Sequence, residues 1–359
     1  MRKNMLVYVL VIFTSLALLT SCKPKNVEVT DTKPVESKEL TGAGATFPKV
    51  LYEKYFENYN QTKGIQVNYQ AVGSGAGISN LIEKMVDFGA TDAPMNAEEE
   101  TKAGAKVLHI PTALGAVVVT YNLPDSPLLK LDATIISGIF LGTIKNWSDP
   151  AIKTLNPDVT LPDQEIVVVH RSDGSGTTYT FTDFLNKADK TWADKLGKGK
   201  SVNWPVGLGG KGNDGVAGLM KQNIGSIGYV EYIFAVNNNF SYALIKNKSG
   251  NFIKPTLESV SLAADVDLPD DLKVSITDTD AKEGYPISTF TWLLVYQEQM
   301  YANRKIGKGL AVANMVWWAT HEAQSMNELL NFGKLAPSVV QKAETLIKSI
   351  TFDGKPILN

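Results

Sequence analysis

The stretch Glu165–Phe181, "EIVVVHRSDGSGTTYTF", joins a strand pattern to a helix pattern through a polar turn. Residues 166–169 form a short apolar run, which is typical of a buried strand. The turn then places one arginine, Arg171, and one aspartate, Asp173, among glycines and hydroxyl side chains. A permanent cation and several hydrogen-bond donors at a strand-to-helix turn are suited to binding an anion, and the alternative is a capped helix with a surface ion pair.

Strand and helix patterns alternate along much of the chain. Residues 48–64 begin with a proline suited to a first helical turn and end with a glycine suited to a helix C-terminus. Residues 65–72 alternate as a strand does. Apolar residues then recur with helical spacing at Ile78, Leu81, Ile82 and Met85. Further strands are expected at 115–123 and 290–297, and further helices at 132–142, 309–321 and 338–350. This alternation predicts an α/β sheet covered on both faces.

The N-terminus has the pattern of a secretion signal. A basic start, an apolar run and the sequence "LTSC" predict a signal peptide over residues 1–21, with cleavage before Cys22. Cys22 is the only cysteine, so it cannot form an intrachain disulfide, and we expect it to be lipidated. An ordinary secretion signal and a short membrane anchor are the alternatives. Residues 22–39 have the composition of a flexible tether.

Composition restricts the remaining possibilities. A chain of 359 residues with 44% hydrophobic content can form two domains, each with its own core. The formal net charge of −2 and the lack of a long basic run argue against a nucleic-acid partner. The histidines His109, His170 and His321 lack metal-ligand spacing, and no P-loop pattern occurs. We therefore expect no metal and no cofactor.

Three glycine-containing turns stand directly before predicted helices. They are residues 42–48 ("GAGATFP"), 73–77 ("GSGAG") and 173–178 ("DGSGTT"). The first N–H groups of a helix lack internal partners, and glycine lets an anion approach them. One such turn alone is usually only a helix cap, whereas three together favour an oxyanion site. Residues 209–215, "GGKGNDG", are interpreted as a plain loop before a helix.

Six motifs between Leu40 and Tyr232 together carry a family resemblance. They are "LTGAGATFP" (40–48), "VDFGATDAP" (86–94), "FLGTIKNW" (140–147), "RSDGSGTT" (171–178), "WPVGLGGKGNDGVAG" (204–218) and "GSIGYVEY" (225–232). The chain resembles the phosphate-binding proteins of bacterial ABC-type phosphate uptake systems. The resemblance implies a type II periplasmic-binding-protein fold, in which two α/β domains meet at a hinge that the chain crosses twice, with a ligand cleft between them. The implied domains are residues 40–120 plus 290–359, and residues 121–289.

The resemblance also implies which residues hold phosphate. They are Thr46, Phe47, Ser74, Asp92, Arg171, Ser175, Gly176 and Thr177, and Asp173 orients the arginine. The chain departs from the family's usual serine at Gly75 and at Thr91.

Asp92 is expected to separate phosphate from sulfate. An ionised carboxylate only accepts hydrogen bonds. Phosphate carries a proton near neutral pH and can donate it, whereas sulfate carries none and leaves the acceptor unpaired in a dry site. The alternative role for Asp92 is a helix N-cap before Pro94.

The sequence thus predicts a monomeric, lipid-anchored, extracytoplasmic receptor that captures inorganic phosphate and delivers it to an ABC permease in the membrane. We expect no catalysis, because no nucleophile, general base and leaving-group site come together. Three alternatives stay open. The chain could serve another oxyanion such as sulfate, molybdate or phosphonate. It could be a hydrolase that uses Ser175 or Ser74. It could also be a surface sensor or adhesin that does not transport.

Overall fold

The computed structural model describes residues 34–358. The predicted signal peptide, Cys22 and residues 22–33 of the predicted tether lie outside the described residues. Within the described part, Ser37 N–H donates to the carbonyl of Gly307 at 2.9 Å, so the chain contacts helix α11 (Ile306–Thr320) before the first strand. No helix among residues 34–358 combines the length and the hydrophobicity needed to cross a membrane.

Nine strands form the main sheet, in the order β2-β1-β3-β12-β4-β8-β6-β7, with β9 paired to β4. Their bounds are β1 (Glu39–Gly44), β2 (Gln66–Ala71), β3 (Phe88–Thr91), β4 (Val107–Asn122), β6 (Val167–Arg171), β7 (Leu208–Gly210), β8 (Ser226–Glu231), β9 (Ser241–Tyr242) and β12 (Ser288–Tyr296). Strands β2, β1 and β3 run parallel to one another, as do β8, β6 and β7. Parallel strands need crossover helices, which is why helices separate them in the sequence.

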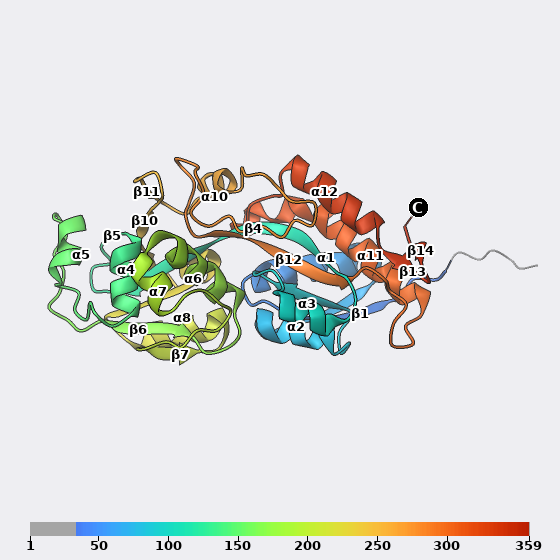
Figure 1. Ribbon diagram of the computed structural model, residues 1–359, viewed down its shortest axis with the longest axis horizontal. Coiled ribbons are helices and arrows are strands. Elements are labelled where there is room, and N and C mark those ends of the chain that lie inside the picture. The colour runs from blue at the N-terminus through green and yellow to red at the C-terminus, as the bar shows by residue number, and fades with distance from the viewer. Residues whose placement is uncertain (1–33, 359) are drawn as a thin grey trace, which may run out of the picture. The chain divides into compact units, whose positions relative to one another are not determined.

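Strand β4 connects the two parallel groups. Residues 107–116 pair antiparallel with β12, and residues 117–122 pair antiparallel with β8. All but the two end residues of β4 are buried. Figure 1 shows β4 and β12 between the helices of the two groups. The pairing changes close to the domain boundary expected at residue 120, and the division into two domains stays a prediction.

Helices flank both parallel groups. Near β1–β3 and β12 lie α1 (Lys49–Lys63), α2 (Ser74–Ile82), α3 (Ala97–Ala103), α11 and α12 (Pro337–Lys348). Near β6–β8 lie α4 (Ala133–Phe140), α6 (Gly176–Ala188), α7 (Lys190–Lys195), α8 (Gly212–Gln222) and α9 (Tyr232–Asn237), and the remaining helices are α5 (Pro150–Leu155) and α10 (Leu257–Ala263). Short strands β5 (Lys130–Leu131), β10 (Leu244–Lys246) and β11 (Phe252–Ile253) form a second sheet, and β13 (Thr351–Phe352) pairs with β14 (Lys355–Pro356).

Several predicted helix ends are confirmed by their caps. Helix α1 ends at Gly64, which has φ +67°, and Asp132 accepts a hydrogen bond from Ile135 N–H at the start of α4. The predicted extent of α2 was wrong, because Lys84 adopts φ +59° and the helix stops at Ile82. Met85 is consequently 68% exposed and does not join the apolar face.

Candidate functional site

Arg171 is the buried cation of the site. It ends β6, and its side chain is 1% exposed. Its Nε donates to Asp173 Oδ1 at 2.8 Å and its Nη2 to Asp173 Oδ2 at 2.6 Å, while Nη1 donates to Thr177 Oγ1 at 3.2 Å. The guanidinium is therefore held in one orientation by a two-point contact, which arginine geometry favours.

Asp173 is an ionised partner for this arginine. Burial raises the pKa of Asp173, but hydrogen bonds from Arg171 outweigh burial and hold the pKa below its usual value. Its Oδ1 also accepts from Gly212 N–H at 3.0 Å, at the start of α8. The carboxylate thus fixes Arg171 and offsets part of its charge.

The N-terminus of α6 adds donors beside the arginine. Ser175 is its N-cap and accepts from Thr178 N–H at 3.0 Å. Gly176 N–H donates to Ser74 Oγ, at the start of α2, at 3.0 Å. A Cβ on Gly176 would lie 2.6 Å from Asp92 Oδ2, so only glycine fits at this position. The glycine-containing turns at 73–77 and 173–178 therefore meet in space.

Asp92 is the buried acceptor of the site. It follows β3 and is 1% exposed. Its Oδ1 accepts from Thr291 Oγ1 at 2.8 Å, and Ser74 Oγ lies 3.4 Å from its Oδ2. Burial raises the pKa of Asp92 to about 7, although hydrogen bonds from Thr291 and Ser74 and the charge of Arg171 oppose the rise. The helix-cap alternative for Asp92 is wrong, because Asn96 caps α3.

Asn213 links Thr46 to the α6 turn. Thr46 is 4% exposed and precedes α1, and its Oγ1 accepts from Asn213 N–H at 3.2 Å and from Asn213 Nδ2 at 3.0 Å. The same Nδ2 lies 3.3 Å from Thr177 Oγ1, and Asn213 Oδ1 accepts from Glu231 N–H at 3.0 Å. The interpretation of residues 209–215 as a plain loop missed this residue. A helix predicted directly after "GGKGNDG", within the longest family motif, was the signal that could have found it.

Phe47 has a different place from the other predicted residues. Its ring is fully buried and packs edge-on against Phe332, with 6.0 Å between ring centroids. The side chain therefore belongs to the core, and only the backbone of Phe47 is suited to contact a ligand.

Together these contacts connect the predicted residues into one buried set. Ser74, Asp92 and Gly176 form one part, and Thr46, Thr177 and Arg171 form the other, joined through the first turn of α6. Backbone and hydroxyl donors at helix N-termini, one guanidinium and one buried acceptor suit a tetrahedral oxyanion that carries a proton. Among residues 34–358, no group of three or more His, Cys, Asp or Glu side chains could hold a metal ion.

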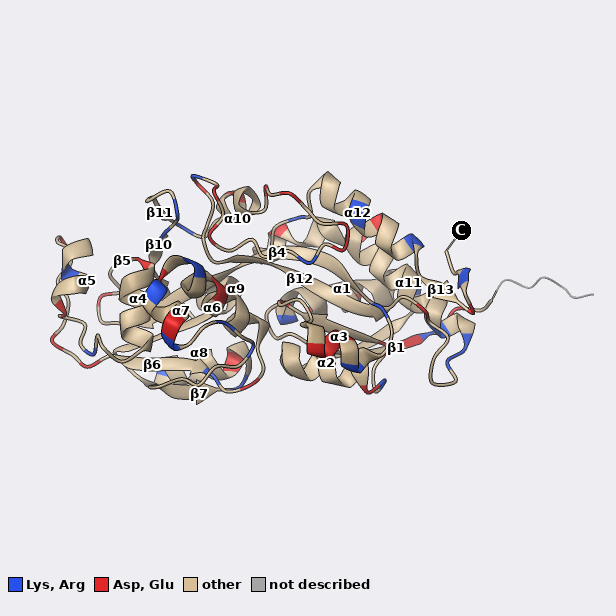
Figure 2. Cartoon of the chain, viewed as in Figure 1, with Lys and Arg blue, Asp and Glu red and all other residues tan. Residues whose placement is uncertain are grey.

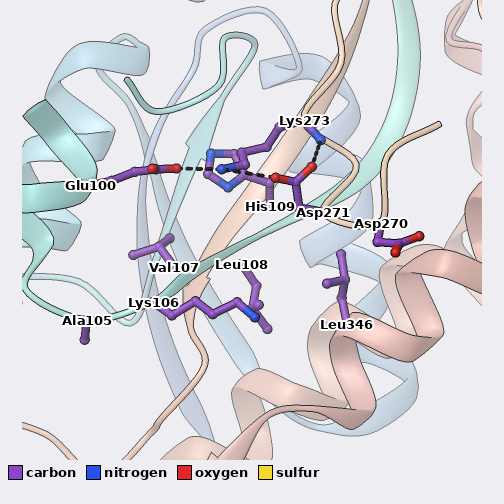
Figure 3. A pocket seen from close by; sticks show the side chains of 10 residues that line it. All are labelled: Glu100, Ala105, Lys106, Val107, Leu108, His109, Asp270, Asp271, Lys273 and Leu346. Atoms are coloured by element: carbon purple, nitrogen blue, oxygen red, sulfur yellow. Dashed lines mark hydrogen bonds and ion pairs between the residues drawn. The ribbon is translucent and has the colours of Figure 1, made fainter. Parts of the chain in front are cut away.

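One cavity of the molecule is lined by none of these residues. It has a volume of about 430 Å³ and lies beside β4 (Figure 3). His109 lines it and accepts from Met95 N–H at 3.1 Å. Burial lowers the pKa of His109 to about 3, so the ring is neutral near pH 7. This histidine has a structural role.

Comparisons with known proteins agree with this fold. The family model described as "PBP superfamily domain" matches residues 29–314. A "Phosphate-binding protein PstS" from Pasteurella multocida is 39% identical over 331 residues, covering 90% of this chain and 94% of the relative. A phosphate-binding protein structure from Stenotrophomonas maltophilia has a TM-score of 0.68 at 19% identity, covering 86% of this chain and 94% of its own. An ABC-type phosphate transport receptor structure from Vibrio cholerae has a TM-score of 0.53 at 19% identity, covering 82% and 100%.

The chain belongs to the PBP superfamily and, within it, to the family of PstS phosphate-binding proteins. The solved structures are those of phosphate-binding proteins with the type II periplasmic-binding-protein fold, so the predicted fold class is confirmed.

Proposed function

We propose that the protein binds inorganic phosphate at the buried set around Arg171 and Asp92. The observation that carries the proposal is the guanidinium of Arg171, 1% exposed and fixed by Asp173, beside the donors at the N-terminus of α6. Asp173 offsets only part of the charge of Arg171. Burial of the remaining positive charge is unfavourable, and a bound anion would compensate it.

Each predicted residue then has a distinct role. Arg171 donates to two phosphate oxygens, and the hydroxyls of Ser175 and Thr177 and the N–H of Gly176 add donors from α6. Ser74 and Thr46 add hydroxyls from the starts of α2 and α1, and Phe47 contributes its backbone N–H. Asp173 orients Arg171.

Asp92 supplies selectivity in this proposal. Its carboxylate shares one proton with the bound anion, and phosphate brings that proton itself. Because the pKa of Asp92 is raised to about 7 by burial, the empty site is close to balance between its charged and neutral forms at neutral pH. Sulfate and molybdate bring no proton, so this residue argues against both as the natural ligand.

The protein is an extracytoplasmic solute-binding component. It captures phosphate and delivers it to an ABC permease. The names of the relatives and of the Vibrio cholerae receptor support this role, and they describe binding and transport proteins and not hydrolases. We propose further that Cys22 carries a lipid anchor, that the protein acts as a monomer, and that residues 40–120 plus 290–359 and residues 121–289 form two domains that close over phosphate.

Calorimetric titration of the full-length chain tests the proposal. After removal of bound ligand, we expect one phosphate per chain with a Kd of about micromolar or tighter, since a handful of charge-assisted hydrogen bonds outweighs the ordering cost. Sulfate should give no heat at pH 8. A folded, ligand-stripped protein that does not bind phosphate would contradict the proposed function. Release of phosphate from a chromogenic ester that is lost in Ser175→Ala would favour the hydrolase instead.

A further inference from the structure

Lys200 connects the loop after α7 to helix α3. Its Nζ donates to Glu99 Oε2 at 2.7 Å and to the carbonyl of Pro94 at 3.4 Å. The two side chains of the Lys200–Glu99 pair are only 13% and 19% exposed. Figure 2 shows the acidic residues on α3. Because water is largely excluded, solvent and salt screen this attraction less than that of a surface pair.

The backbone of Lys200 is fastened to the helix that carries the phosphate donors. Its carbonyl accepts from Ser175 N–H at 2.8 Å. Lys198 Nζ donates to Asp183 Oδ1 at 2.5 Å, and Gly199 N–H donates to Thr182 Oγ1 at 3.1 Å. Residues 198–200 are therefore attached to α6 at three points along its first two turns. The position of Lys200 is consequently coupled to that of the N-terminus of α6.

The other end of the pair is fastened near Asp92. Glu99 forms a capping box with Asn96, in which Glu99 Oε2 accepts from Asn96 N–H at 2.9 Å. Pro94, the second acceptor for Lys200, lies two residues after Asp92. Glu99 is thus held on the segment that positions the selective carboxylate.

We propose that the Lys200–Glu99 pair is a positioning contact that holds the N-terminus of α6 against Asp92 and slows the release of phosphate. The proposal rests on the proposed function and on the two-domain division, which assigns Glu99 to the first domain and Lys200 to the second. When the pair forms, Gly75 N–H also reaches the carbonyl of Gly174, at 2.9 Å. The side chains of Lys200 and Glu99 contact none of the predicted phosphate donors. The pair would therefore affect phosphate binding by holding the two proposed domains together.

The pair Glu98–Lys102 on helix α3 is the control. Lys102 Nζ lies 2.7 Å from Glu98 Oε1, with side-chain exposures of 63% and 74%. Both residues belong to α3, so this ion pair does not attach α6 to Asp92.

A double-mutant cycle on the full-length chain tests the inference. Lys200→Gln removes the cation and keeps the backbone carbonyl, and Glu99→Gln keeps a side chain that can complete the capping box. We expect each single variant to lose about 5- to 30-fold in phosphate affinity, the loss of a charge-assisted contact discounted for partial exposure. The loss should appear mainly as a faster dissociation rate in stopped-flow measurements. The double variant should lose no more than either single variant, and Lys200→Arg should recover most of the affinity.

The controls separate this inference from the proposed function. Glu98→Gln should keep phosphate affinity within about twofold of the parent, since an exposed pair within one helix contributes little. Thermal unfolding without phosphate identifies any variant that fails to fold. If Lys200→Gln does not fold, Glu99→Gln and Lys200→Arg still test the contribution of the pair. A parent protein that does not bind phosphate defeats the proposed function. A parent that binds phosphate, with losses that simply add or with dissociation rates unchanged, overturns only the role of the pair.

Discussion

The affinity of this protein for sulfate should depend on pH, whereas that of an Asp92→Asn variant should not. Sulfate has no proton to share, so it can bind beside Asp92 only when the carboxyl itself is protonated. Burial raises the pKa of Asp92 to about 7, above the value of 3.8 for an ordinary aspartate. Protonation of Asp92 in the empty protein is therefore nearly free at pH 7 and becomes costly at higher pH.

The size of the effect follows from this pKa. Each pH unit above the pKa adds about 1.4 kcal/mol to the cost of protonating the carboxyl, which is a factor of ten in binding. Because half of the carboxyl groups are already ionised at pH 7, the sulfate affinity should fall about 50-fold between pH 7 and pH 9. Below pH 6 it should level off, because Asp92 is already protonated in the empty protein. The amide in Asp92→Asn does not titrate, so its sulfate affinity should stay flat.

Competition calorimetry at pH 5, 6, 7, 8 and 9 at constant ionic strength would measure this slope. Phosphate, titrated in parallel, should change much less above pH 7, because it brings its own proton. The reasoning would be refuted by a wild-type sulfate affinity that is level from pH 7 to pH 9. An equal slope in Asp92→Asn would likewise assign the titration to another group.

Three further substitutions test other parts of the site. Arg171→Lys loses the two-point contact with Asp173, and calorimetry should show phosphate affinity reduced about 10- to 100-fold with unfolding temperature little changed. Thr46→Val removes the acceptor for both Asn213 donors and should cost about 5- to 30-fold in phosphate affinity, while Thr46→Ser should bind normally. Glu231 is buried with no hydrogen-bond partner for Oε1 among the described residues, and burial raises its pKa well above the usual value. Its contribution to stability is therefore lost as pH rises, so urea unfolding at pH 8 should find Glu231→Gln at least as stable as the parent.

Local sequence patterns were sufficient for several helix ends, whereas the candidate site residues came from the family resemblance. Glycine after α1, aspartate before α4 and hydroxyls at the α6 turn each act on backbone groups within a few residues, and such effects are visible in sequence. The pairing of Arg171 with Asp173 is equally local, because only one residue separates them at a strand end. The end of α2 was missed since Lys84 in a left-handed conformation has no sequence signature.

The contacts that determine the chemistry of Asp92 are distant in sequence. Thr291, which donates to Asp92, lies 199 residues away on β12. Asn213 reaches Thr46 across 167 residues. Periodicity and spacing cannot bring such residues together, because they are joined by the pairing of β3 with β12 and by hydrogen bonds between the starts of α8 and α1. The raised pKa of Asp92 is likewise a property of burial, which the residue type does not show.

The charge balance of the site explains why proton count can decide its selectivity. Asp173 offsets part of the charge of Arg171, and the attraction for an anion comes from the remaining charge together with the N–H and hydroxyl dipoles. Such donors favour phosphate and sulfate to a similar degree, because both are tetrahedral oxyanions. The one feature that treats them differently is Asp92, which can be satisfied only if a proton arrives with the ligand or from water. Because the pKa of this carboxyl is near 7, the preference for phosphate over sulfate should increase steeply as the pH rises above 7, where phosphate still carries a proton.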